Sequence, residues 1–204
     1  VAGLTKADTI DGGDGSDTLK ITAGATQTFL DHKISNIEIL EIANPAGNST
    51  NDVKAIDDTT SISLIAGVTN TDIVVSNLAA AQAVTVTNDS AATLELGNVA
   101  LNLEDDTGLT DSMTVNLVAK TNAAQTLDLL TVDDASETLN LDVSGVTTTT
   151  LATTLTSLIA DGAKTINITG AGNLVTTLNQ TGTNVTTLID ASAHTGELKI
   201  TDGV

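Results

Sequence analysis

The sequence predicts an all-β protein folded as a right-handed parallel β-helix, a solenoid of stacked coils. Threonine is the commonest polar residue, with 38 copies in 204 residues, and its β-branched side chain favours extended backbone. Short runs of alternating apolar and polar residues recur along the chain, with Asn, Asp or Gly between them. The chain has one Phe and no Trp or Tyr, so aliphatic layers of a solenoid are easier to fill than the centre of a β-sandwich, which is the alternative fold.

The first part of the chain, residues 1–45, is expected to hold a metal-binding turn that leads into the first strands. Residues 12–20 fit the nonapeptide Gly-Gly-x-Gly-x-Asp-x-apolar-x, the repeat of the calcium-binding parallel β-roll. Nine residues upstream, residues 8–10 repeat the Asp-x-apolar half. A short helix or turn within residues 22–36 and a strand over residues 37–43 follow, and Pro45 ends this part.

The nonapeptide predicts a calcium β-roll turn because its glycines permit positive φ and direct carbonyl oxygens toward an ion, while its aspartates add charge. Asp8 and Asp17 lie one period apart and are expected to face one ion, together with oxygens near Gly12 and Asp14. Asp11 belongs to the same candidate site. The alternative interpretation is a flexible Asp-Gly hairpin turn that holds no ion.

Residues 46–204 read as a threonine-rich β-solenoid, expected to form one continuous domain with residues 1–45. Val115, Leu127, Leu139 and Leu151 are each 12 residues apart, and a constant step favours coils stacked on coils. The apolar runs that mark candidate strands include residues 84–86, 94–96, 101–103, 127–129, 139–143, 166–168 and 198–200.

One segment departs from the all-β pattern. Leu151, Leu155, Leu158 and Ile159 have the spacing of an amphipathic helix, and Asp161-Gly162 follows as a stop signal. A short helix near residues 150–160 is therefore predicted.

Charge and composition exclude several classes of function. The formal charge is −19, and all seven basic residues are Lys, so nucleic acids and anionic membranes are repelled as partners. No apolar stretch is long enough to insert into a bilayer, and without Cys a cation site must use oxygen ligands. Calcium is the expected cofactor, and the dense acidic run Glu104, Asp105 and Asp106 is a second candidate site.

The sequence does not favour an enzyme. Polysaccharide lyases and epimerases combine β-helices with such nonapeptides, but their chemistry needs Arg, Tyr or His to bind uronates and transfer protons. This chain has no Arg or Tyr, and its two imidazoles, His32 and His194, lie outside any catalytic motif.

Several segments together resemble secreted bacterial surface-layer (S-layer) proteins and their relatives with repeats-in-toxin calcium motifs. The specific part is residues 8–19, Asp-Thr-Ile-Asp-Gly-Gly-Asp-Gly-Ser-Asp-Thr-Leu. Four further segments are similar to that group in their pattern of strand and turn residues: 34–40, 163–170, 185–192 and 196–201. The resemblance covers most of the chain but contains only one full nonapeptide and a decayed copy.

The resemblance implies a secreted structural protein of the cell surface that folds with calcium outside the cell and assembles into a lattice. The expected partners are further copies of the chain and a surface polysaccharide. The alternative is a segment of a repeats-in-toxin adhesin that serves as an extension or binding module. Because the sequence begins at Val1 without Met, we expect it to be a piece of a longer polypeptide.

Overall fold

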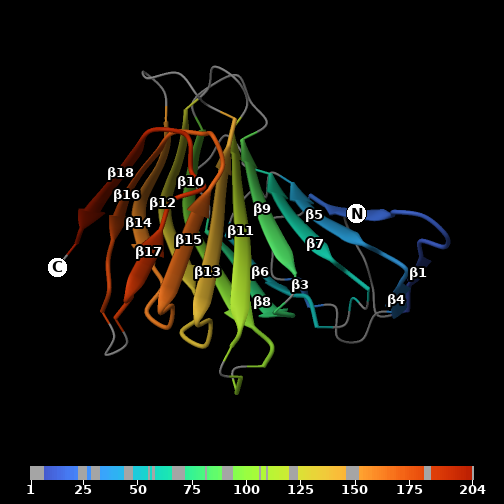
Figure 1. Cartoon of the computed structure of the whole chain (residues 1–204). Helices are drawn as coiled ribbons and strands as arrows, with labels where there is room; N and C mark the ends of the chain where they lie inside the picture. Colours follow the sequence, from blue (N-terminus) through green and yellow to red (C-terminus); the bar gives the residue numbers. More distant parts are fainter. Residues whose placement is uncertain are drawn as a thin grey trace.

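The computed structural model describes residues 7–22, 27–28, 33–43, 48–54, 56, 58–65, 72–80, 82–88, 94–105, 107–108, 110–119, 124–145, 152–181 and 185–203. These residues form a right-handed parallel β-solenoid, which confirms the predicted fold class (Figure 1). Strands far apart in sequence stack side by side in two sheets of eight strands, and every described pairing between strands is parallel. The β-sandwich alternative is therefore wrong.

The chain alternates between the two large sheets as it winds. The first sheet contains β2 (Thr18–Ile21), β5 (Ile39–Ala43), β7 (Ser61–Ile65), β9 (Ala83–Asn88), β11 (Ser112–Ala119), β13 (Thr138–Ser144), β15 (Thr165–Thr169) and β17 (Leu188–Asp190). The second contains β3 (Gln27–Thr28), β6 (Ser49–Asp52), β8 (Ile73–Leu78), β10 (Leu94–Leu103), β12 (Gln125–Val132), β14 (Thr153–Ile159), β16 (Leu174–Leu178) and β18 (Leu198–Asp202).

Within the described residues, a short third sheet lies at the amino-terminal end. It pairs β1 (Thr9–Asp11) with β4 (Lys33–Ser35), and Ile56 continues it through a bridge to Ile34. The first coils therefore have a third face, and in the described part of the later coils one parallel bridge, between Gly170 and His194, lies outside the named strands. Both large sheets continue from one side of residue 45 to the other, since β5 pairs with β7 and β3 pairs with β6.

The core lies between the two large sheets and consists of aliphatic ladders. Alternate residues of each strand point inward, so like residues of successive coils stack on one another. Val115, for example, lies between Val84 and Leu141, and all three are at most 1 % exposed. Each coil closes the core of the one beside it, which is how a chain nearly without aromatic residues fills its interior.

The 12-residue spacing of Val115, Leu127 and Leu139 is not the length of one coil. These residues lie in β11, β12 and β13, so a step of 12 passes from one sheet to the facing sheet. Val115 stacks on Leu141, and Leu127 stacks on Leu155. A full coil is therefore about two of those steps. Leu151 lies outside the described residues.

The helix predicted near residues 150–160 is wrong, because residues 153–159 form β14. Leu155 and Leu158 are both buried although they are three residues apart, since the register between β14 and β16 shifts between them. The same spacing of buried residues occurs in β12, where Leu127 and Leu130 face the core. A bulged strand thus reproduces locally the spacing of a helix face.

The two ends of the solenoid differ. In the first coil, Leu19 and Ile21 of β2 are 4 % and 1 % exposed, as in the interior. In the last coil, all three residues of β17 are exposed. Among the described residues, no helix has the length and hydropathy needed to cross a bilayer.

Candidate functional site at the amino-terminal aspartate-glycine turn

The candidate site is the turn of residues 12–17, which carries the chain from β1 in the third sheet to β2 in the first sheet. Strand β4 and strand β5 of the next coil stack beside β1 and β2, so the segment that joins them, residues 36–38, lies against the turn. Gly13 and Gly15 have φ of +83° and +134°, values that side chains rarely permit. The glycines of the motif are therefore needed for the shape of this turn.

Asp11 ties the turn to the next coil. Its Oδ1 accepts hydrogen bonds from the backbone N–H of Gly13 (3.1 Å) and from Nδ2 of Asn36 (2.6 Å). The N–H of Gly12 donates to the carbonyl oxygen of Ser35 at 3.1 Å. A Cβ on Gly12 would overlap the carbonyl oxygen of Asn36 and lie 2.7 Å from Cβ of Asp17, so the close approach of the coils requires glycine here.

Asp17 and Glu38 form the most distinctive contact of the site. The N–H of Asp17 donates to Oε2 of Glu38 at 2.8 Å, and the N–H of Ile39 donates to the carbonyl oxygen of Asp17 at 3.0 Å. Oδ2 of Asp17 is buried and has no hydrogen-bond partner within the described part of the chain. A buried carboxylate oxygen without a donor is costly, and Glu38 brings a second negative charge to hydrogen-bond distance from the Asp17 backbone.

The same arrangement recurs farther along the solenoid at Asp111 and Glu137. The N–H of Asp111 donates to Oε2 of Glu137 at 2.8 Å, and the N–H of Thr138 donates to the carbonyl oxygen of Asp111 at 3.1 Å. Oδ2 of Asp111 is also buried, with no hydrogen-bond partner in the described ranges. Both pairs precede strands of the first sheet, so we call them the corner carboxylate pairs: Asp17–Glu38 and Asp111–Glu137.

The structure brings together some, but not all, of the residues predicted for the nonapeptide site. Asp11, Gly12 and Asp17 lie together against residues 36–38. Asp8 and Asp14 are exposed, on the approach to β1 and at the tip of the turn. The nine-residue period does not stack Asp8 on Asp17, because the coil above the turn comes from residues 33–43.

The second predicted group, Glu104, Asp105 and Asp106, follows β10. Glu104 forms an ion pair with Lys54, with Oε1 and Nζ 3.0 Å apart. Oδ1 of Asp105 accepts hydrogen bonds from the side chain and backbone of Thr107, at 2.6 and 3.0 Å, and these bonds lower the pKa of Asp105. Asp106 lies outside the described residues. Glu104 and Asp105 thus each have a protein partner of their own.

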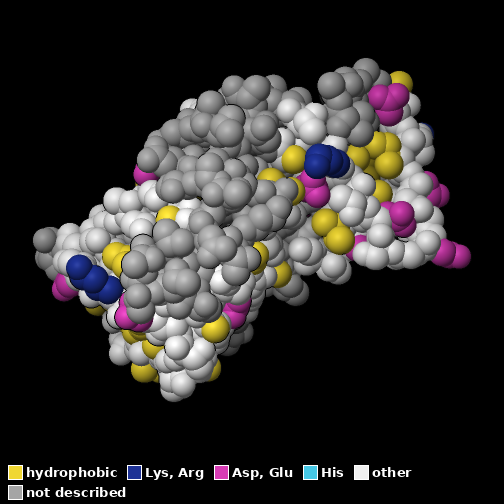
Figure 2. Space-filling model, turned by 90° about the horizontal axis from the view of Figure 1, so that it is seen from above, with side chains coloured by type: hydrophobic (Ala, Val, Ile, Leu, Met, Phe, Trp, Pro, Cys, Tyr) yellow, Lys and Arg dark blue, Asp and Glu magenta, His cyan; other side chains and the backbone are white. Residues whose placement is uncertain are grey.

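The donor chemistry of the turn suits a hard cation, since all its candidate ligands are carboxylate, amide or carbonyl oxygens. Within the described ranges, however, no three or more His, Asp or Glu side chains converge closely enough to hold a metal ion. Acidic side chains are scattered over the surface in view in Figure 2 and do not gather into one patch. The buried, unpartnered Oδ2 atoms of Asp17 and Asp111 therefore distinguish the corner carboxylate pairs from the acidic side chains scattered over the surface.

Sequence reasoning missed the contributions of Asn36, Glu38, Asp111 and Glu137. A signal for three of them is visible in the sequence: an acid stands directly before an alternating strand at Glu38, Asp111 and Glu137. That pattern marks the corner at which a strand of the first sheet begins. It does not show which corners are neighbours, because that depends on the length of each coil.

Comparisons with known proteins assign no family to this chain. The sequence matches no family model, no curated protein and no solved structure.

Proposed function

We propose that this chain is a secreted structural component of the cell surface that folds with calcium and self-assembles into an S-layer lattice. The observation that carries the calcium part of the proposal is the buried, unpartnered Oδ2 of Asp17 beside Glu38 of the next coil. Stacked coils supply the stiff body that a lattice needs, and the resemblance of residues 8–19 to repeats-in-toxin motifs supplies the class of ion.

Calcium at a corner carboxylate pair would remove two penalties together. It would give the unpartnered oxygen a ligand bond, and it would neutralise repulsion between two acids of adjacent coils. Its contribution to stability grows with concentration as RT ln(1 + [L]/Kd). Extracellular sites with Kd of about 10⁻⁴ to 10⁻³ M would be filled outside the cell and empty inside it, so stable folding would follow export.

The test is thermal unfolding by circular dichroism, with calcium, with magnesium and with chelator. At 10 mM calcium, one site in that range of Kd adds about 1.4–2.7 kcal/mol, which raises the Tm by about 3–11 °C for a chain of this size. Asp17→Asn should remove most of one site's gain, and in chelator it should be neutral or stabilising because it relieves repulsion. Asp134→Asn, at an exposed turn residue, is the matched control.

Equal Tm values in calcium and in chelator would overturn calcium-dependent folding. A loss of the calcium effect in Asp134→Asn equal to that in Asp17→Asn would show that the effect is general charge screening.

A repeats-in-toxin adhesin segment is the second candidate, favoured by the solenoid as a rod-like spacer. Electron microscopy of the calcium-loaded protein separates the two functions. An ordered two-dimensional array supports the lattice protein, whereas isolated rods support the adhesin.

A further inference from the structure

The turns that lead from the second sheet to the first sheet differ in length around β8. Residues 79–82, between β8 and β9, number four, whereas residues 53–60 and 104–111, in the coils on either side, number eight each. A short turn between two longer ones leaves a notch in the side of the solenoid. This side notch is a hollow of about 200 Å³, and its described lining residues all lie between Val53 and Glu104.

An ion pair spans the side notch from one long turn to the other. Nζ of Lys54 lies 3.0 Å from Oε1 of Glu104, although β8 separates their strands, β6 and β10, by about 10 Å. The two side chains are 52 % and 42 % exposed, so the pair forms an accessible rim. An ammonium group has three N–H donors and a carboxylate has two acceptor oxygens. Each partner therefore has hydrogen-bonding capacity beyond the ion pair.

The base of the side notch is apolar and is held in place by hydrogen bonds. Val53 and Ile56 line it and are 2 % and 3 % exposed, and Ala79 lines it from the short turn. Oε1 of Gln82 accepts from the N–H of Ala79 at 2.9 Å, and its Nε2 donates to the carbonyl oxygen of Thr59 at 2.7 Å. These bonds fix the short turn to the coil before it, so the notch is formed before any ligand arrives.

The charges and donors of the side notch select the class of ligand. One lysine stands against two acids, Glu104 and Asp58, so an anion is disfavoured in a chain of charge −19. The ammonium of Lys54 disfavours a divalent cation, and within the described residues no three acidic or imidazole side chains converge on one point. The polar rim disfavours a wholly apolar molecule. A sugar fits, because each hydroxyl both donates and accepts a hydrogen bond, and the C–H face of its ring matches the apolar base.

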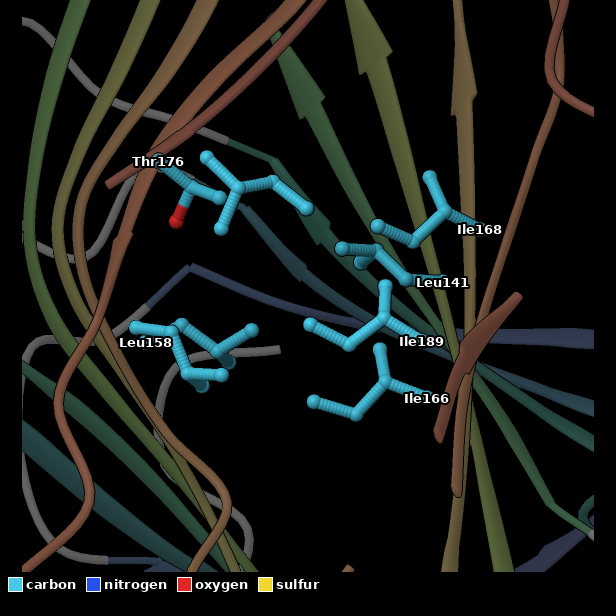
Figure 3. Close-up of a pocket in the computed structure, with 8 residues that line it drawn as sticks. Leu141, Leu158, Ile166, Ile168, Thr176 and Ile189 are labelled. Atoms are coloured by element: carbon cyan, nitrogen blue, oxygen red, sulfur yellow. The ribbon is translucent and has the colours of Figure 1, made fainter. Parts of the chain in front are cut away.

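The size of the side notch limits the ligand to one small unit, since sites for drug-sized ligands measure about 300–1,000 Å³. A hollow between the two sheets differs in size and in chemistry. In Figure 3, Leu141, Ile166 and Ile168 point into it from the first sheet and Leu158 from the second, and its space is about 10 Å³. A space of that size has room for about one water and is apolar, so it is a packing gap of the core.

We infer that the side notch is a saccharide-binding site that takes one sugar ring, with Lys54 and Glu104 hydrogen-bonded to its hydroxyls across the short turn. The inference goes beyond the proposed function, because its chemistry uses neither calcium nor a second copy of the chain. The chain has no Trp or Tyr on which a sugar could stack, so a single unit should bind with a Kd in the millimolar range.

NMR titration of the ¹⁵N-labelled protein with the methyl glycosides of glucose, mannose, galactose and N-acetylglucosamine, each up to roughly 50 mM, tests the inference. We expect at least one glycoside to shift the amide signals of residues 54, 79, 82 and 104 in a saturable way. Sodium phosphate at the same concentration should not produce these shifts, because the notch disfavours anions. The absence of a saturable shift with all four glycosides would overturn the inference.

Two variants with matched controls locate the site. Glu104→Gln removes the charge of the rim at unchanged size and should raise the Kd about tenfold, whereas Glu41→Gln, which breaks the ion pair of Glu41 with Lys20 on the first sheet, should leave it unchanged. Ala79→Phe fills the notch and should abolish the saturable shifts. Ala80→Phe, at the next and also exposed residue of the short turn, which is not among the lining residues, should keep the Kd within about threefold of the original.

Circular dichroism of each variant checks that the solenoid is intact. Binding that survives Ala79→Phe, or a loss as large in the two control variants as in their partners, would overturn the inference. Saturable binding by a protein whose Tm does not respond to calcium would refute the proposed calcium-dependent folding and keep the side notch as a sugar site. A protein that calcium stabilises but that binds none of the glycosides would keep the proposed function and refute the sugar site.

Discussion

Gln125 offers a sharp test of how this core tolerates polar groups. It is the first residue of β12, it is 1 % exposed, and neither Nε2 nor Oε1 has a hydrogen-bond partner in the described part of the molecule. Burying a polar group without a partner costs about 1–3 kcal/mol in proteins. Gln125→Met keeps the length and flexibility of the side chain and removes both polar atoms.

We therefore expect Gln125→Met to stabilise the protein by about 2 kcal/mol. For a chain of this size, that raises the Tm by about 4–8 °C. Urea unfolding followed by circular dichroism gives the free energy, and the slope against denaturant should stay unchanged because the surface exposed on unfolding is the same.

Gln82 provides the matched control, because the same substitution there should have the opposite sign. Its Nε2 donates to the carbonyl oxygen of Thr59 at 2.7 Å, and its Oε1 accepts from the N–H of Ala79 at 2.9 Å. Gln82→Met removes both bonds; the exposed N–H of Ala79 can then bond to water, but the carbonyl of buried Thr59 loses this donor, so the variant should destabilise by about 0.5–1.5 kcal/mol.

The result that would refute the reasoning is a destabilisation by Gln125→Met as large as that by Gln82→Met. Such a result would mean that the amide of Gln125 is bonded in solution. A candidate partner is Thr153, its register partner on β14, whose Oγ1 also has no hydrogen-bond partner among the described residues. Thr153→Val would then destabilise the original protein and have little effect on Gln125→Met.

Two further predictions concern single turns. Gly145 has φ of +107°, and a Cβ there would overlap the carbonyl oxygen of Ala119, so Gly145→Ala should lower the free energy of unfolding, measured in urea, by more than about 2 kcal/mol. Gly13 has φ of +83° but open space around it, so Gly13→Ala should lower it by only about 1–2 kcal/mol. Equal losses in the two variants would contradict the steric argument. Hydrogen bonds from the side chain and backbone of Ser192 lower the pKa of Asp190, so their stabilising effect is present above the ordinary pKa of aspartate and is lost as the pH falls through the lowered value. NMR titration should show the pKa of Asp190 rise in Ser192→Ala, and an unchanged pKa would exclude the side-chain bond as its main cause.

The corner carboxylate pairs show how far sequence reasoning reached toward the candidate site. The aspartate-glycine turn was visible because its glycines and aspartates have fixed spacing within a few residues. The partner of Asp17 was not visible, because Glu38 is 21 residues away and meets Asp17 only when the coils stack. The nine-residue period suggested Asp8 instead, since local spacing carries no information about which coil lies above the turn.

The helix predicted over residues 150–160 failed for a related reason. Inward-facing residues of a regular strand are two apart, but a bulge in β14 puts Leu155 and Leu158 on the same face. Sequence spacing alone cannot separate this from one face of a helix. The neighbouring strands β12 and β16 decide it, because they supply the hydrogen-bonding partners of β14.

The sequence by itself determined the class of fold, because alternation of aliphatic and polar residues and abundant threonine act within each strand and need no knowledge of distant partners. Only the tertiary structure decided which residues are neighbours along the solenoid. The spacing between register partners varies from 20 residues, between Leu158 and Leu178, to 31 residues, between Ala83 and Thr114. Register is fixed by packing across coils of unequal length, and so the meeting of Asp17 with Glu38 and the exposed face at Ile189 emerge only when the coils are stacked.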